Sequence, residues 1–244
     1  MSAYDQFTTE VHRQLQQVET TQRPAIEQTA RWVAEALMRD RFLWAFGTGH
    51  SHMIAEEIFY RAGGLARGAP ILEPKLMLHD QAIEATYLER KSGFAEEILL
   101  PHPLAAGDVL VVGSNSGRNA VPIEIALGGK ARGLKVVGIT NLNQSRRWPS
   151  RHASGKRLFE VVDLVIDTCG VDGDAAVTID DFPHRIGPTS SLTALMIINL
   201  IVVQAIEYSV QAGHLPEVYI SSNTKGDDHN ERLLEKYRTH IRHL

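Results

Sequence analysis

Residues 109–119, VLVVGSNSGRN, decide the fold class of this 244-residue chain. Their first part, VLVVG, is a continuous apolar run of the kind that forms a strand covered on both faces. Their second part, SNSGRN, combines hydroxyl, amide and glycine residues, which favour a tight turn. A helix pattern follows over residues 120–131. A buried strand, a tight turn and a helix in this order predict one βα unit of an α/β protein.

The same alternation of strands and helices extends along the chain. Apolar runs predict strands, and apolar or amphipathic stretches predict helices. The expected strands are residues 42–46, 69–72, 108–113, 134–139 and 161–167, and the expected helices are residues 3–38 (two helices, the second opened by Pro24), 51–61, 120–131, 189–212 and the segment from Asp227. Residues 73–104 predict a long loop and a broken helix around residues 83–100. The pattern predicts a doubly wound, three-layer α/β/α sandwich with a mainly parallel sheet of about five strands.

We expect a single domain, because the chain has no internal repeat and no low-complexity linker. Its length suffices for one large hydrophobic core. The predicted parts are an N-terminal helical segment (1–40), a core (41–212) and a C-terminal tail and helix (213–244).

Composition narrows the functional classes. The net charge of -4 gives no general attraction for nucleic acid. The one cysteine, Cys169, excludes an internal disulfide framework and suits a reducing cytosol, and the polar start predicts no signal peptide. The most apolar stretch, residues 192–206, is interrupted by Asn199 and Gln204 and is shorter than the about 20 apolar residues of a membrane span. We therefore expect a cytoplasmic protein with neither nucleic-acid nor membrane partners.

Polar turns follow two of the predicted strands. Residues 47–51, GTGHS, follow the strand at 42–46, and residues 114–119 follow the strand at 108–113. Parallel strands end at one edge of the sheet, where open α/β sheets bind ligands. The unpaired N–H groups of the helix after each turn attract anions. The two turns together predict a phosphate site, although each alone also fits a polar turn that caps a helix, with Ser51 as one such N-cap.

A third polar stretch, residues 187–191 (GPTSS), opens the long apolar helix at 189–212. Pro188 fits the first helical position, and capping accounts for one of the three hydroxyl groups. Ligand contact and capping both stay open as interpretations here. The basic residues of the loop at 143–157 fit a solvated loop, a flap over an anionic ligand or a subunit contact.

A nicotinamide dinucleotide is an alternative ligand for the first turn. Gly47-x-Gly49 after a strand begins the Rossmann fingerprint, and Glu73 stands where a ribose-binding acid would lie. The third glycine of the fingerprint would fall at His52. This departure disfavours a dinucleotide, so no cofactor is expected. The histidines form no compact metal-binding pattern either, so no metal is expected.

The three turns, in this order, resemble the phosphosugar-binding elements of the SIS (sugar isomerase) domain family. Those elements are a Gly-x-Gly-x-Ser turn, a Ser-x-Ser-Gly turn and a Thr/Ser-rich start of a long C-terminal helix, and the resemblance covers residues 30–212. The N-terminal helices and the Asp228-His229-Asn230 tail are similar to those of a bacterial SIS subgroup of unassigned activity. Its relatives are phosphoheptose isomerases and N-acetylmuramic acid 6-phosphate etherases. The resemblance implies a phosphorylated sugar as ligand and a homodimer or homotetramer as the assembly.

The resemblance also implies roles for individual residues. The first turn and the start of the long helix would contact the sugar end, and the second turn would hold the phosphate oxygens. The implied substrate-binding residues are Gly49, Ser51 and His52 in the first turn, Ser114, Asn115, Ser116, Gly117 and Asn119 in the second, and Thr189 and Ser190 at the helix start.

The catalytic residues of the family transfer only in part. Phosphoheptose isomerases carry a His and a Glu one turn apart on the helix after the first turn, where this chain has Glu57 and Arg61. Their metal site is therefore not supported. Glu57 is the predicted base, with His184 or His229 (the latter from a neighbouring subunit) as the ring-opening acid or base. Further acidic candidates are Glu56, Asp80, Glu84 and Glu89.

The leading hypothesis is an aldose–ketose isomerase that acts on a phosphorylated sugar by general acid/base chemistry. A sugar-phosphate sensor without catalysis is the first alternative, and a phosphosugar lyase or etherase is the second. Turnover separates the enzymes from the sensor, and a second product separates the lyase from the isomerase.

Overall fold

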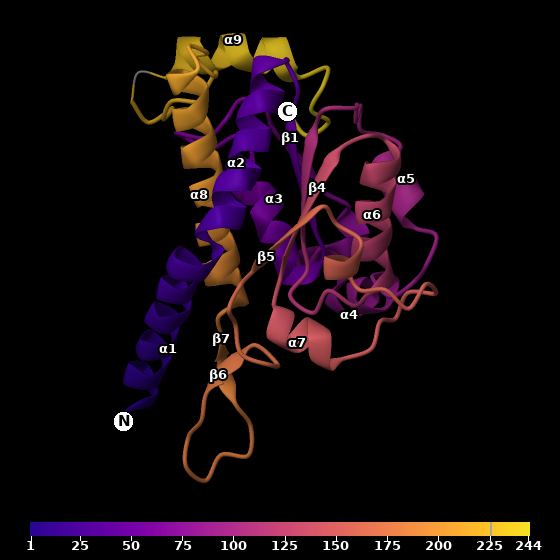
Figure 1. Cartoon of the computed structure of the whole chain (residues 1–244), viewed down its shortest axis with the longest axis vertical. Coiled ribbons are helices and arrows are strands. Elements are labelled where there is room, and N and C mark those ends of the chain that lie inside the picture. The colour runs from indigo at the N-terminus through magenta and orange to yellow at the C-terminus, as the bar shows by residue number, and fades with distance from the viewer. Residues whose placement is uncertain (225) are drawn as a thin grey trace.

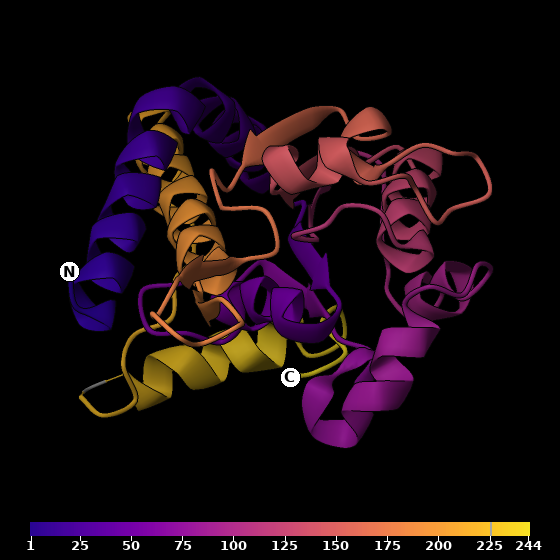
Figure 2. The same ribbon diagram turned by 90° about the horizontal axis from the view of Figure 1, so that it is seen from below.

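The computed structural model, which describes residues 1–224 and 226–244, has a five-stranded sheet with helices on both faces (Figures 1 and 2). The strand order is β2-β1-β3-β4-β5, and every neighbouring pair is parallel. The strands are β1 (Leu43–Gly47), β2 (Gly68–Ile71), β3 (Val109–Gly113), β4 (Lys135–Thr140) and β5 (Leu164–Asp167). This order is that of a doubly wound α/β fold. The predicted fold class is confirmed.

Nine α-helices are assigned in the described residues. They are α1 (Ala3–Gln17), α2 (Arg23–Met38), α3 (Met53–Ile58), α4 (Leu78–Leu88), α5 (Ala95–Leu99), α6 (Ala120–Ala131), α7 (Leu142–Arg147), α8 (Ser190–Gln211) and α9 (Asp227–Tyr237). A π-helical segment, Val18–Gln22, separates α1 from α2. Pro24 lies in the first turn of α2, as its fixed φ favours.

Alternate residues of the central strand β1 divide the core into two layers. Leu43 and Ala45 pack with buried residues of α2, α3 and α8 on one face. Trp44 and Phe46 pack with buried residues of α5, α6 and α9 on the other face. All four side chains are fully buried. Helices on both faces explain why this strand is apolar at every position.

Helix α8 packs along α2, and both cover the same face of the sheet (Figure 1). In the described part of the chain, α8 is the one helix long and apolar enough to cross a membrane, with a mean hydropathy of 1.7. Ile197, Ile198 and Ile201 are buried in the core layer that includes α2. Packing in the core therefore also explains why α8 is so apolar. Val203 on the same helix is 65% exposed, so part of this apolar helix faces outward. The homo-oligomer expected from the sequence stays a prediction.

The first helix after β1 differs from expectation. The chain forms a 3-10 turn, Gly49–His52, before α3, so the helix expected at 51–61 is divided and ends at Ile58. Ser51 therefore lies inside the 3-10 turn and is not the N-cap of α3.

Three further boundaries differ. The strand expected at 161–167 begins at Leu164, because residues 158–160 form a 3-10 turn and Asp163 Oδ2 accepts a hydrogen bond from Val136 N at 2.9 Å. Residues 73–104 contain two separate helices, α4 and α5. Residues 170–188, which the sequence pattern assigns to none of the expected strands, contain a small antiparallel hairpin, β6 (Ala175–Val177) and β7 (Ile186–Pro188).

Candidate functional site

The turn after β3 is built as an open cradle of backbone amides. Gly117 N donates to Ser114 O at 3.1 Å and to Ser114 Oγ at 3.2 Å, which closes the turn. Asn119 then has the extended conformation of an N-cap, and α6 begins at Ala120. Among the described residues, the amides of Asn115, Ser116, Arg118 and Asn119 have no hydrogen-bond acceptor. Unpaired amides at the start of a helix form an anion-binding arrangement.

Gly117 is required by the shape of this turn. Its φ is +60°, a conformation that side chains other than glycine rarely adopt. A Cβ atom there would lie 2.6 Å from Ser145 Oγ and 2.8 Å from Thr140 Oγ1. The turn therefore packs directly against the end of β4 and the start of α7.

A pocket lies beside this cradle, at the carboxyl edge of the sheet. Its polar lining comes from the two turns, from the residue that follows β5 and from the start of α8. The polar residues that line it are His50, Ser51, Ser114, Asn115, Thr168, Ser190 and Ser191. Asn115 Oδ1 and Thr168 Oγ1 are buried and have no partner in the described structure. Buried polar atoms of this kind normally have a partner, so these two are suited to a polar ligand.

The turn after β1 forms the second wall of the pocket. Gly47 approaches the backbone of the 3-10 turn so closely that a Cβ atom would lie 2.1 Å from Ser51 O. Gly49 has a φ of +54°. The His52 ring Nδ1 contacts Gly49 O, so His52 holds the turn, while Ser51 lines the pocket.

Glu89 lies between the two turns and connects them. Thr48 Oγ1, in the first turn, donates to Glu89 Oε2 at 2.7 Å, and Asn119 Nδ2, in the second, donates to Glu89 Oε1 at 2.7 Å. Burial raises the pKa of the Glu89 carboxyl, and the Thr48 hydrogen bond and the charges of Arg90 and Arg151 offset part of this effect. Glu89 does not itself line the pocket; it lies next to the cradle, bonded to both turns. A carboxyl group with a raised pKa in such a position is a candidate general base.

Asn119 has a different environment from the one implied by the resemblance. Its side chain donates to Glu89, and its Oδ1 accepts a hydrogen bond from Arg151 Nη1 at 2.8 Å. In this structure the Asn119 amide therefore orients the carboxylate and the arginine. A ligand anion would meet its backbone N–H.

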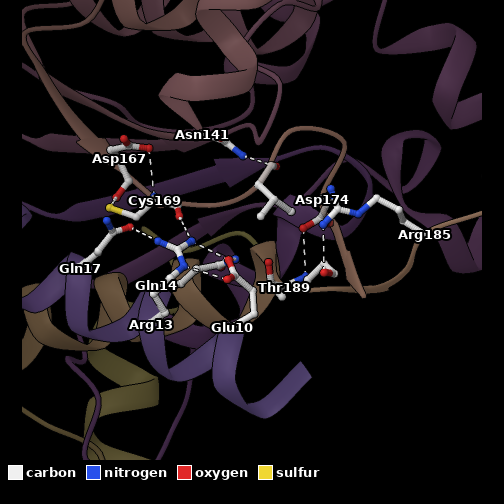
Figure 3. Close-up of polar contacts among 12 residues, drawn as sticks. Glu10, Arg13, Gln14, Gln17, Asn141, Asp167, Cys169, Asp174, Arg185 and Thr189 are labelled. Atoms are coloured by element: carbon white, nitrogen blue, oxygen red, sulfur yellow. Dashed lines mark hydrogen bonds and ion pairs between the residues drawn. The ribbon is translucent and has the colours of Figure 1, made fainter. Parts of the chain in front are cut away.

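The start of α8 is capped from the hairpin (Figure 3). Asp174 Oδ1 accepts from the amides of Thr189 at 3.0 Å and Ser190 at 2.8 Å, and Asp174 Oδ2 accepts from Ser190 Oγ at 2.8 Å. A carboxylate at a helix N-terminus is favoured by the unpaired amides there. Thr189 Oγ1 is buried without a partner in the described structure. Capping thus explains Ser190, and Thr189 keeps a free hydroxyl.

Figure 3 also shows how α1 is joined to the loop after β5. Arg13 forms an ion pair with Glu10, contacts Gln17 and donates to Cys169 O at 3.4 Å. Asn141 Nδ2, at the end of β4, donates to Val171 O in the same loop at 2.8 Å. These contacts hold the N-terminal helix beside the carboxyl edge of the sheet.

The three predicted catalytic side chains do not line the pocket. The Glu57 carboxylate is ion-paired with Arg61 and accepts a hydrogen bond from Asn199 Nδ2 at 2.6 Å. His184 is exposed in the loop of the β6–β7 hairpin. His229 Nε2 lies 2.9 Å from Val218 O, and its helix, α9, crosses the end of the molecule opposite to α7 (Figure 1).

Glu89 is the acidic residue that the structure brings to the cradle instead. The sequence named it only as one of several acidic candidates. Within the described residues, no group of three or more His, Cys, Asp or Glu side chains could hold a metal ion.

The fold and the site define an α/β protein with an anion cradle and a polar pocket at the carboxyl edge of a parallel sheet. The chain belongs to the SIS domain family, whose model matches residues 6–141. A UPF0309 protein from Halalkalibacterium halodurans is 42% identical over 217 residues, which cover 88% of this chain and 87% of the relative. A UPF0309 protein from Caldanaerobacter subterraneus is 38% identical over 244 residues, which cover 98% of this chain and 99% of the relative.

Two solved structures share the fold at low sequence identity. The phosphoheptose isomerase GmhA of Neisseria gonorrhoeae has a TM-score of 0.53 at 18% identity, and the match covers 81% of this chain and 94% of that one. The Vibrio vulnificus NanR protein complexed with ManNAc-6P has a TM-score of 0.51 at 16% identity, and the match covers 96% of this chain and 69% of that one.

Proposed function

We propose that this protein binds a phosphorylated sugar, with the phosphate on the turn at 114–119 and the sugar in the adjoining pocket. The unpaired amides of Asn115, Ser116, Arg118 and Asn119 support a phosphate on that turn. The hydroxyl groups of Ser51 and Thr168 and the free Asn115 Oδ1 offer partners for sugar hydroxyls. Membership of the SIS family supports the same ligand class.

We further propose that the protein is an aldose–ketose isomerase and that Glu89 is its base. The observation that carries this proposal is the position of Glu89, hydrogen-bonded to both turns, with burial raising its pKa. Its carboxylate takes the proton from the carbon beside the sugar carbonyl, the electron pair of that C–H bond forms the C=C bond of the enediol, and the carbonyl oxygen takes up a proton from water. The carboxyl group then returns its proton to the former carbonyl carbon, while the hydroxyl on the neighbouring carbon loses its proton to water and becomes the new carbonyl. No group leaves and no oxidant is needed. Thr48 and Asn119 hold the carboxylate in place between the turns.

Deuterium exchange tests this proposal directly. Each hexose, heptose or amino-sugar monophosphate of a panel is incubated with the protein in D₂O, and NMR follows the proton beside the carbonyl. We expect exchange and a new isomer with one substrate. Glu89→Gln should abolish both while the sugar phosphate still binds, and Glu84→Gln, which changes an exposed residue of α4, the helix that Glu89 follows, should change neither.

Each outcome separates the alternatives. Binding without exchange by any phosphosugar would refute the isomerase and favour the sensor. Exchange together with a second product would favour the lyase or etherase. Full activity of Glu89→Gln would remove Glu89 from the chemistry.

A further inference from the structure

Three arginine side chains gather beside Glu89 and Asn119. Arg90 follows Glu89 in sequence, Arg118 lies in the turn after β3, and Arg151 lies in the loop after α7. Backbone hydrogen bonds hold these segments together, because Arg151 N donates to Arg118 O at 2.8 Å and Val121 N donates to Glu89 O at 3.1 Å. Segments about 30 and 60 residues apart in the chain therefore bring three positive charges to one side of the cradle.

The charges of this arginine cluster (Arg90, Arg118 and Arg151) are not balanced by protein carboxylates. Within the described residues, none of the three forms an ion pair with a carboxylate oxygen within 4.0 Å. Burial lowers the pKa of Arg151 first, and the nearby charges of Arg118 and Arg90 lower it further. Glu89 is a single acid beside three cations. Like charges repel at such range unless an anion lies among them.

Two other arginines of the loop at 143–157 are paired. Arg147 forms an ion pair with Asp172 at 2.7 Å, and Arg157 forms one with Glu160 at 2.7 Å. Asp172 and Glu160 thus pair Arg147 and Arg157, whereas Arg151 and the exposed Arg146 have no carboxylate partner among the described residues. Of these two, Arg151 is the one bonded to Asn119 at the cradle, and this position favours a ligand as its partner.

Two of the three guanidinium groups also lie within cation–π distance of an aromatic ring. Arg118 lies 5.9 Å from the Trp148 ring centre and donates from Nε to Pro149 O at 2.9 Å, which leaves its terminal nitrogens free of partners in the described structure. Arg90 lies 5.9 Å from the Tyr87 ring centre. A planar guanidinium with free N–H groups suits two-point binding of a carboxylate or a phosphate.

We propose that the ligand carries a second anionic group, a carboxylate or a second phosphate, which the arginine cluster binds while the turn at 114–119 holds the first phosphate. This inference rests on the proposed phosphosugar site and narrows its substrate class. It also gives the basic loop at 143–157 a role in ligand recognition through Arg151.

Two matched pairs of compounds test the second anion. Sorbitol 6-phosphate and 6-phosphogluconate differ at carbon 1, which is an alcohol in the first and a carboxylate in the second. Fructose 6-phosphate and fructose 1,6-bisphosphate differ by the second phosphate. Calorimetric titration at fixed ionic strength should give at least tenfold tighter binding of the doubly anionic member in one pair, and that pair identifies the group.

Variants assign the effect to the cluster. Arg90→Gln should reduce the gain from the second anion to less than threefold and leave the affinity for the monophosphate within twofold. Arg151→Gln should reduce the same gain. Arg146→Gln, which changes an exposed arginine of the same loop, should keep the full gain.

The failures of the two proposals are distinguishable. Binding of the monophosphates with no gain in either pair would overturn the second-anion inference alone. An equal gain in the wild type and Arg90→Gln would overturn the assignment to the cluster. No binding of any sugar phosphate would overturn the phosphosugar site and the inference with it.

Discussion

Replacing Gly117 by alanine should loosen the turn at the centre of the site. The φ of +60° costs an alanine about 1 kcal/mol relative to glycine. The new Cβ would lie 2.8 Å from Thr140 Oγ1 and 2.6 Å from Ser145 Oγ, so both hydroxyls must rotate. Rotation breaks the 3.3 Å hydrogen bond from Thr140 to Asn115 O, worth about 1 kcal/mol, and off-rotamer strain adds about 1 kcal/mol. The free energy of unfolding should fall by about 3 kcal/mol in total.

Gly155→Ala is the matched control for this variant. Gly155 has a φ of +71°, but no atom lies within 4 Å of the position of its Cβ. The free energy of unfolding of Gly155→Ala should therefore fall by only about 1 kcal/mol, the conformational cost of a positive φ for alanine. Urea unfolding of both variants, followed by fluorescence and circular dichroism, measures the difference. Equal losses in the two variants would refute the packing of the turn against Thr140 and Ser145.

Three further predictions concern single side chains. Ser116→Ala should weaken phosphosugar binding about tenfold or more, if the Ser116 hydroxyl joins the backbone amides in binding the phosphate, because a hydrogen bond to a charged group is worth about 1.5–3 kcal/mol; titration with unchanged affinity would remove the hydroxyl from the phosphate site. Asp108→Asn should lower the free energy of unfolding by about 2–4 kcal/mol in urea, because the buried Asp108 carboxylate accepts hydrogen bonds from Phe42 N, Trp44 Nε1 and Ala105 N. Burial, followed by the charges of His243 and Arg242, lowers the pKa of His102 to about 4. The unfolded chain takes up this proton at a higher pH than the folded chain, so stability falls between about pH 6.5 and pH 4. The free energy of unfolding, measured in urea, should fall by about 2 kcal/mol from pH 7 to pH 5. His102→Gln should remove this part of its pH dependence.

Contiguous features of the site could be predicted from the sequence. The strand, turn and helix around residues 109–131 follow from local patterns, and the helix was expected within its observed bounds, Ala120–Ala131. The 3-10 turn at Gly49–His52 was not expected, because Ser51 is a favourable N-cap residue and a 3-10 turn differs from an α-helix by one residue of register.

Contacts between distant segments could not be predicted in the same way. Glu89 lies 41 residues from Thr48 and 30 from Asn119, in a segment whose helices have no simple periodicity. Asp174 reaches the start of α8 through a hairpin that the sequence presents as a polar loop. Nothing in the local sequence distinguishes Glu89 or Asp174 from the other acidic residues of the chain. Only the arrangement of the sheet and its loops gives them partners.

The packing of α8 along α2 has a consequence for synthesis. The apolar face of α2 is made early, and the helix that covers it begins at Ser190, about 150 residues after α2 ends. At a ribosomal rate of about 5–20 residues per second, this face waits roughly 10–30 s for its cover. Val33 and Leu37, buried in the finished protein, are exposed during that interval. The nascent chain therefore offers a hydrophobic surface to chaperones until the last fifth of the protein is made.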